Sequence, residues 1–179
     1  MDALTGAYRE IAVPVRVFGD LRDAVAKEAG PLPAIRALHA AGYAAGVAAA
    51  DELRSSPDED LRALPAEAFW ARVSDFFSRR GWGTLTHEAI HEAVGTLTSP
   101  DWAEGTAPGA DDASCSFSTG FLSGLLTSLA GGPIAVLEVS CRARGDGRCS
   151  FAFGNALAIH DLYGRLVEGA DLSGALASL

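Results

Sequence analysis

Three cysteines and one glutamate are the residues whose types and spacing most clearly allow metal chemistry. Cys141 and Cys149 flank the segment Arg-Ala-Arg-Gly-Asp-Gly-Arg, Glu138 stands three residues before Cys141, and Cys115 lies further upstream. If the chain reverses direction at Gly145, residues 141 and 149 face each other across a hairpin, with Cβ atoms about 4.5–5.5 Å apart. Two sulfur atoms at that separation can bind one zinc ion.

Glu138 and Cys115 set further geometric conditions on such a site. Side chains alternate between the faces of a flat strand, so joint ligation by Glu138 and Cys141 requires a β-bulge or a sharp twist between them. Cys115 directly precedes a predicted helix, whose dipole favours the thiolate form that binds metal. Four such ligands would form a closed tetrahedral site, in which zinc is structural rather than catalytic. Spacing alone leaves two alternatives open: a Cys141–Cys149 disulfide, and three free buried thiols.

A second pattern with metal chemistry is His87-Glu-Ala-Ile-His91, which matches H-E-x-x-H. On a helix, the two histidines would share a face and bind zinc while the glutamate activates water, as in metalloproteases. The flanking segments Thr84-Leu-Thr and Gly95-Thr-Leu-Thr favour strands, in which the two imidazoles are spread apart. We therefore expect the match to be coincidental, and a zinc hydrolase is only a remote alternative.

The hydrophobic pattern predicts helices, a hairpin, a helix, a second hairpin and a last helix. Helices are predicted over residues 15–30, 33–55, 65–80, 118–130 (capped by Ser118 or Thr119) and 155–168. Antiparallel strands are predicted over 83–99, turning near 89–92, and over 134–153, turning at 145–147. Residues 114–117 are predicted to be extended, and 56–63 and 100–113 to be loops. This order predicts an α+β fold in which an antiparallel sheet of two hairpins is covered by helices. The small residues Gly42 and Gly46, one helical turn apart, predict close packing against another helix, in the core or across a dimer.

Composition restricts the classes of function. The chain has 179 residues, of which 49% are hydrophobic and 21% charged, which suits one compact domain without a membrane span. Fourteen basic residues against 23 acidic ones give a formal charge of −9, which argues against binding to nucleic acid. The first residues lack the basic and apolar regions of a signal peptide, and we expect a cytoplasmic protein.

The second half of the sequence resembles the 4-vinyl reductase domain family. This family includes the phenol- and xylene-sensing input domains of bacterial transcription activators and an accessory protein of bacteriochlorophyll synthesis. The matching residues are the run from Cys115 to Leu129, the run Gly-Pro-Ile-Ala-Val-Leu-Glu138-Val-Ser-Cys141, and Gly-Asp-Gly-Arg-Cys149-Ser-Phe. In the aromatic sensors, a cysteine before the helix, a Glu-x-x-Cys and a further cysteine hold zinc. The resemblance therefore implies a structural zinc ion at Cys115, Glu138, Cys141 and Cys149.

The resemblance also implies a layout. It is dense over residues 80–155 and loose over the preceding helices, and it implies a fold similar to that of transport-particle subunits and nitric-oxide sensors, commonly as a homodimer. We expect one domain, 1–179, with a helical part (1–80) that dimerises and covers a pocket, a zinc-containing core (81–155) and a C-terminal helix (156–179).

The function implied by the resemblance is the binding of a hydrophobic or aromatic small molecule, as a sensor or carrier. The candidate wall residues are Phe76, Phe77, Trp82, His87, His91, Trp102, Phe117, Phe121 and Leu125. Each aromatic residue, taken singly, is also explained by ordinary core packing. No G-x-G-x-x-G motif opens a helix after a strand, so we expect no redox enzyme. The alternative is an accessory factor of tetrapyrrole biosynthesis that works with a protein partner.

Overall fold

A computed structural model describes residues 10–55, 61–106 and 115–179, and all structural statements concern these ranges. The helices are α1 (Val17–Ala29), α2 (Pro31–Arg54), α3 (Ala66–Ser78), α4 (Ser116–Ala130), α5 (Ala156–Val167) and α6 (Leu172–Ala177). The strands are β1 (Thr86–His91), β2 (Val94–Ser99), β3 (Ala135–Ser140) and β4 (Cys149–Gly154). Short 3₁₀ helices cover Leu61–Ala63 (η1), Glu104–Thr106 (η2) and Arg142–Arg144 (η3).

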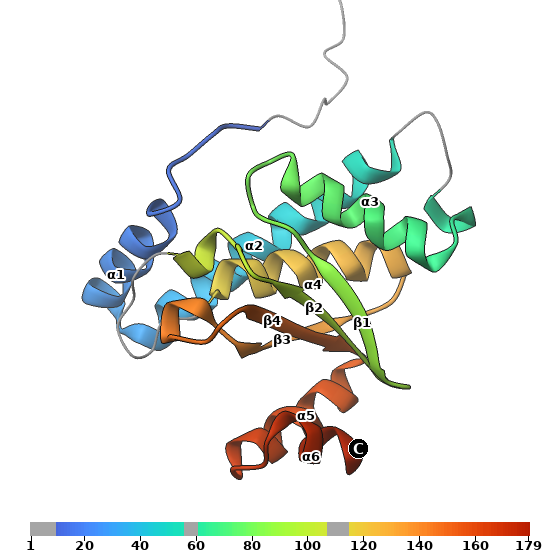
Figure 1. Cartoon of the computed structure of the whole chain (residues 1–179). Coiled ribbons are helices and arrows are strands. Elements are labelled where there is room, and N and C mark those ends of the chain that lie inside the picture. Colours follow the sequence, from blue (N-terminus) through green and yellow to red (C-terminus); the bar gives the residue numbers. More distant parts are fainter. Residues whose placement is uncertain (1–9, 56–60, 107–114) are drawn as a thin grey trace, which may run out of the picture.

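The strands form one antiparallel sheet in the order β1-β2-β4-β3. Each hairpin supplies two neighbouring strands, and β2 pairs with β4 to join them. Helices α2, α3 and α4 lie on one side of this sheet, and α5 and α6 lie on the other (Figure 1). The predicted α+β fold with a helix-covered sheet of two hairpins is confirmed.

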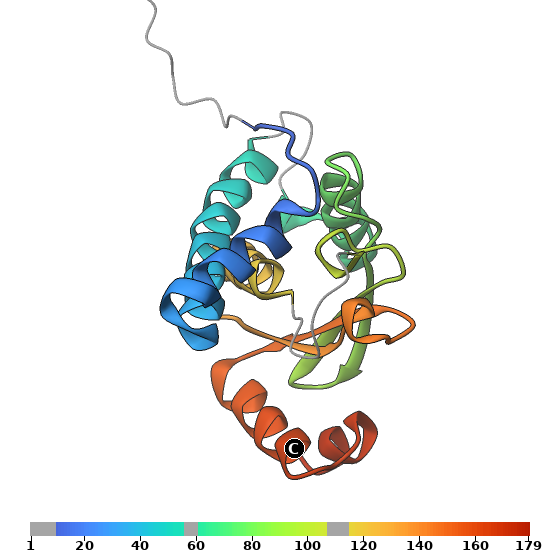
Figure 2. The same ribbon diagram turned by 90° about the vertical axis from the view of Figure 1, so that its left-hand side faces the viewer.

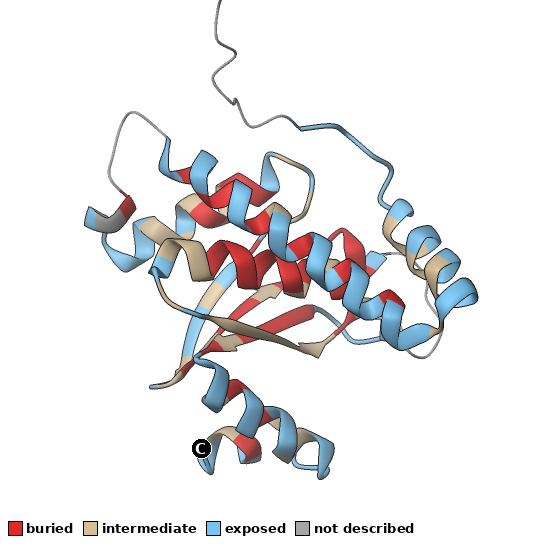
Figure 3. Ribbon diagram, turned by 180° about the vertical axis from the view of Figure 1, so that it is seen from behind, coloured by how far each residue is buried: buried red, intermediate tan, exposed pale blue. Residues whose placement is uncertain are grey.

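Alternation along the central strands divides the hydrophobic core into two parts. Phe151 of β4 and Leu97 of β2 are buried with α2, α3 and α4, whereas Ala152 and Val94 are buried with α5 and α6. Successive strand residues point to opposite faces, so one strand serves both parts. Buried residues concentrate along α4 and the sheet, while α1 and the outer face of α5 are largely exposed (Figure 3).

The packing of α2 against α4 depends on glycines in both helices. A Cβ atom on Gly46 of α2 would lie 2.0 Å from the carbonyl oxygen of Phe121, and one on Gly120 of α4 would lie 2.0 Å from that of His39. Gly42 and Gly124 are placed in the same way. The end-on view shows α2 and α4 side by side above the sheet (Figure 2). The predicted close packing is confirmed, and its location is the core of this chain.

Several element boundaries differ from the prediction. Helix α4 begins at Ser116 with Cys115 as its N-cap, so the extended piece over 115–117 and the caps at Ser118 or Thr119 were wrong. The strand predicted to reach residue 143 ends at Ser140, where the chain turns into η3. Helix α6 was not predicted; Asp171 caps it by accepting a hydrogen bond from the backbone N–H of Gly174. Of the predicted loops, 56–60 and 107–113 lie outside the described residues.

None of the described helices is both long enough and apolar enough to cross a lipid bilayer.

Candidate metal centre and ligand cavity

The three cysteines meet where the start of α4 approaches the second hairpin. Cys115 is the N-cap of α4, Cys141 follows β3, and Cys149 is the first residue of β4; all three are fully buried. Their sulfur atoms lie within 4.8 Å of one another, and those of Cys115 and Cys141 are 3.7 Å apart. The three thiols are free, so no disulfide joins them.

A β-bulge brings Glu138 to the same place. Glu138 pairs with Phe151, but Ser140 pairs with Ser150, so the register shifts between residues 138 and 140. The shifted register is the one that sets residue 141 against residue 149. Both carboxylate oxygens of Glu138 accept hydrogen bonds from the backbone N–H of Cys115, at 3.1 and 3.2 Å. The irregularity required for joint ligation is therefore present, and Glu138 lies beside the sulfur group.

The loop after Cys141 is held by short-range hydrogen bonds. Asp146 accepts a hydrogen bond from the backbone N–H of Cys141 at 2.7 Å, and the Cys141 carbonyl accepts from the N–H groups of Arg144 and Asp146. Gly145 has a φ of 95°, a left-handed conformation that glycine adopts without strain. These contacts fix the backbone that presents the Cys141 sulfur.

Sequence reasoning missed Glu104 and Gly105 of η2, which lies against the same cluster. The buried carboxylate of Glu104 accepts hydrogen bonds from the backbone N–H groups of Phe117 and Ser118 at 3.1 and 2.8 Å. It thereby caps α4 from a distance in the sequence. A Cβ on Gly105 would lie 2.4 Å from the Cys149 sulfur and 3.7 Å from that of Cys115. No local pattern signals either role, because both depend on contacts between separate segments.

The buried acidic groups perturb one another's ionisation. Burial raises the pKa of Glu104 to about 7 and that of Glu138 to about 8. Hydrogen bonds with Cys141 and Cys149, together with burial, raise the pKa of the Cys115 thiol. The pKa of Cys149 is lowered, because its thiolate accepts hydrogen bonds from the other two thiols. A divalent cation would stabilise such a group in its ionised form, and three sulfurs with one carboxylate are a donor set that suits zinc.

Seven of the nine candidate wall residues lie together in the core. Phe77 contacts Trp102 and Phe121, with ring centroids 5.2 and 5.4 Å apart, and Trp82 stacks on Phe117 at 5.9 Å. Phe76 packs edge-on against Phe77, and Leu125 is buried in the same cluster. The indole N–H of Trp102 donates to the Ser118 hydroxyl at 2.8 Å.

The two remaining candidates, His87 and His91, lie on β1. Residues four apart in a strand are separated by about 13 Å along it, too far to share one metal ion. The β-bulge between Ala89 and His91 adds a further irregularity. The strand rules out the helical arrangement that an H-E-x-x-H zinc site requires, and the expectation that the match is coincidental agrees with this geometry. His87 instead stacks on Trp70, with ring centroids 4.1 Å apart.

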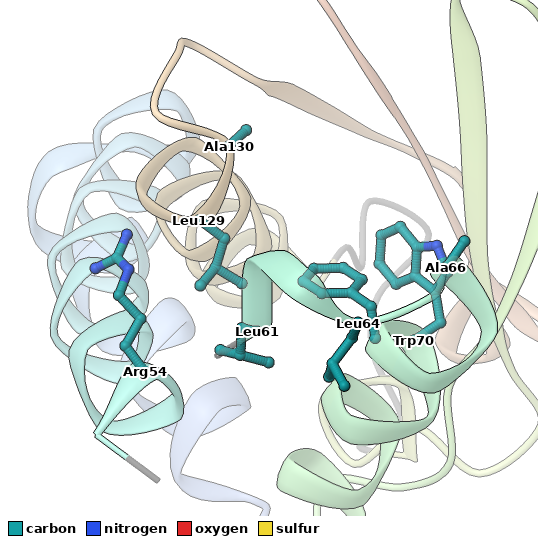
Figure 4. Close-up of a pocket in the computed structure, with 8 residues that line it drawn as sticks. Arg54, Leu61, Leu64, Ala66, Trp70, Leu129 and Ala130 are labelled. Carbon is teal, nitrogen blue, oxygen red and sulfur yellow. The ribbon is translucent and has the colours of Figure 1, made fainter. Parts of the chain in front are cut away.

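The larger hollow lies near the C-terminal ends of α2 and α4, away from most of the expected walls. A cavity of about 710 Å³ is lined by Arg54, Leu61, Leu64, Ala66, Phe69, Trp70, Leu129 and Ala130 (Figure 4). A smaller one of about 180 Å³ adjoins it and reaches the sheet, lined by Phe69, Trp70, Leu126, Leu129, Ala130, Ile134 and Phe153. On the outer side of Trp70, a groove of about 650 Å³ between α3 and β1 includes His87.

Fold and site together define a class of small α+β domains with a cysteine cluster beside a helix-covered sheet. Residues 104–155, which carry all four proposed zinc ligands, match the vinyl-4-reductase (4VR) domain family. This segment of the chain is therefore a 4VR domain, and the resemblance to the 4-vinyl reductase domain family is confirmed for it. Comparison with curated proteins gave no match.

Solved structures support the fold over most of the chain. The phenol-responsive sensory domain of the transcription activator PoxR, solved with phenol, has a TM-score of 0.71 and 18% identity, covering 89% of this chain and 83% of that one. A trafficking protein particle complex subunit 3 from Naegleria fowleri, covalently bound to palmitic acid, has a TM-score of 0.62 and 14% identity, covering 78% and 91%. A vinyl-4-reductase family protein from Methanocaldococcus jannaschii has a TM-score of 0.54 and 15% identity, covering 80% and 82%. At these identities the likeness concerns the fold.

Proposed function

We propose that this chain is a small-molecule-binding domain that holds a hydrophobic or aromatic ligand between α3 and α4, as a sensor or carrier. The observation that carries the proposal is the apolar cavity of about 710 Å³ with its extension of about 180 Å³ toward the sheet. Its size lies in the range of small-molecule sites, about 300–1,000 Å³, and its walls are mainly aliphatic and aromatic. The fold it shares with the PoxR phenol-sensing domain supports the same function.

The second part of the proposal is one structural zinc ion bound by Cys115, Glu138, Cys141 and Cys149. Its support is the convergence of three buried, free sulfurs with an adjacent carboxylate. Zinc would neutralise these ionised groups and join the start of α4 to the second hairpin. A zinc–thiolate site suits a reducing compartment, and we place the protein in the cytoplasm.

Zinc would also support the cavity, because the same elements serve both. Helix α4 begins at Cys115 and contributes Leu126 and Leu129 to the cavity wall. Strand β4 begins at Cys149 and contributes Phe153. A metal that fixes the relative position of α4 and β4 at one end therefore limits their motion at the other.

Filling the cavity tests the ligand site. Ala130, the exposed last residue of α4, lines both parts of the cavity. We expect Ala130→Trp to abolish binding of a neutral aromatic alcohol, 4-phenyl-1-butanol, measured by isothermal titration calorimetry, with an unchanged circular dichroism spectrum. The control is Ala156→Trp, the same change at an exposed position of α5 on the other side of the sheet. Equal binding by Ala130→Trp and the unmodified chain would refute the site.

We also propose that the chain forms a homodimer through α1 and α2. These helices expose apolar side chains: Val17, Leu21, Ile35, Tyr43 and Val47 are between 37% and 49% exposed. Exposed apolar residues that gather on neighbouring helices mark interaction surfaces. Light scattering should give the mass of a dimer for the unmodified chain and of a monomer for Tyr43→Glu with Val47→Glu. A monomeric mass for the unmodified chain would contradict this proposal.

A further inference from the structure

The two adjoining cavities form one space whose ends differ in chemistry. They share four wall residues: Phe69, Trp70, Leu129 and Ala130. The outer part adds Arg54, the only charged side chain among the described lining residues of either part. The inner part adds Leu126, Ile134 and Phe153, which are apolar. A ligand that occupies the whole space meets a cation at one end and apolar side chains at the other.

The guanidinium of Arg54 retains hydrogen-bonding capacity. It donates through Nη1 to Asp51 at 2.8 Å and through Nη2 to the carbonyl of Ser128. An arginine has five N–H donors, so these two bonds leave donors for another acceptor. The side chain of Asp51 is 77% exposed, and ion pairs in such solvated surroundings contribute little. The Ser128 carbonyl, near the end of α4, meanwhile holds the guanidinium against the helix that forms the cavity wall, and Figure 4 shows Arg54 across the opening from Trp70.

The inner end suits a compact apolar group. Its volume of about 180 Å³ is close to that of an apolar cavity of about 150 Å³ known to bind benzene. The rings of Trp70 and Phe153 lie 5.4 Å apart at an angle of 50°, which offers an aryl or short alkyl group both faces and edges to pack against.

We propose that the ligand is an amphipathic carboxylic acid, with its carboxylate on Arg54 and its aryl or alkyl body in the inner cavity. This inference rests on the proposed function, since it names the class of ligand for the same site. The chain carries a net charge of −9, so a general attraction for anions is excluded. Preference for an acid over its neutral analogue must therefore come from a local cation, and Arg54 supplies it with charge-assisted hydrogen bonds.

The test compares 4-phenylbutyrate with 4-phenyl-1-butanol on the purified full chain by isothermal titration calorimetry. The two compounds share an apolar body and differ in the carboxylate. We expect the acid to bind at least about tenfold more tightly, as one charge-assisted hydrogen bond implies. In Arg54→Gln the two affinities should become equal, while that of the alcohol stays within about twofold. Arg36→Gln, the same change at an exposed position of α2, should keep the full preference.

The outcomes separate this inference from the proposed function. Equal affinities for acid and alcohol in the unmodified chain would refute the role of Arg54 and leave the apolar site standing. An equal loss of both compounds in Arg54→Gln, with an unchanged melting temperature, would also refute it. Binding of neither compound to the unmodified chain would refute the apolar site itself.

Discussion

Gly105 shows how a single residue without a side chain shapes the cysteine cluster. Its α-carbon faces two sulfurs so closely that an added methyl group would lie 2.4 Å from the sulfur of Cys149. That sulfur is fully buried and has no free space to move into.

We expect Gly105→Ala to lower the free energy of unfolding by about 1–3 kcal/mol, the usual cost of an overpacked core, and to weaken zinc binding. Equilibrium unfolding in urea and the zinc content by mass spectrometry measure the two effects. Gly147→Ala is the control, because a Cβ there has no atom within 4 Å. Similar behaviour of both variants would show that η2 is not packed against the sulfurs.

At the residue scale, the sequence predicted the ligand set better than its surroundings. Hairpin arithmetic paired Cys141 with Cys149, and the required bulge after Glu138 is present. Both arguments use local geometry, for which residue spacing is sufficient. The part played by Glu104 depends on η2 meeting the start of α4, which no spacing within either segment reveals.

The contact between α2 and α4 is the feature of the fold most sensitive to side-chain volume. Each helix places glycines against backbone atoms of the other, so the obstacle to a larger residue is a carbonyl group. A backbone carbonyl within a helix cannot rotate away as the end of a flexible side chain can.

We expect Gly46→Ala to destabilise the protein by about 1–3 kcal/mol or more, because the two helices would have to separate. Gly164→Ala makes the same change inside α5, where a Cβ meets no atom within 4 Å. There it should stabilise the protein by about 0.5–1 kcal/mol, since alanine favours the helix. Urea unfolding of both variants gives the sign of each effect, and a neutral result for Gly46→Ala would contradict the close packing.

At the element scale, the sequence predicted the interiors of helices and strands well and their ends less well. Periodic burial made α2, α3 and α5 recognisable, and Gly131 ended α4 as expected for a left-handed C-cap. The start of α4 was misplaced, because Cys115 caps it without a side-chain hydrogen bond while Glu104 supplies the acceptor. A long-range cap replaces the local signal on which the prediction relied.

The location of the cavity is a property of the whole molecule. The aromatic residues expected to surround a ligand lie together with Leu125 in the core, in contact with one another, and the larger space opens beside Arg54 and Trp70. A sequence shows which side chains are apolar, but the packing of three helices on the sheet decides which of them leave room between them. The family resemblance therefore predicted a pocket more reliably than it predicted the pocket's walls.

Removal of zinc tests the three interpretations of the cysteines on the intact protein. If zinc joins α4 to the second hairpin, a strong chelator should lower the melting temperature by on the order of 10 °C, as expected for the loss of a tightly bound ligand from a chain of this size. Cys149→Ser should contain no zinc and should melt at the same temperature with or without chelator. A chain without zinc whose melting ignores the chelator would be one of the two alternatives, and a thiol assay after unfolding separates them. Three reactive thiols would indicate free cysteines, whereas one would indicate a disulfide between two of them.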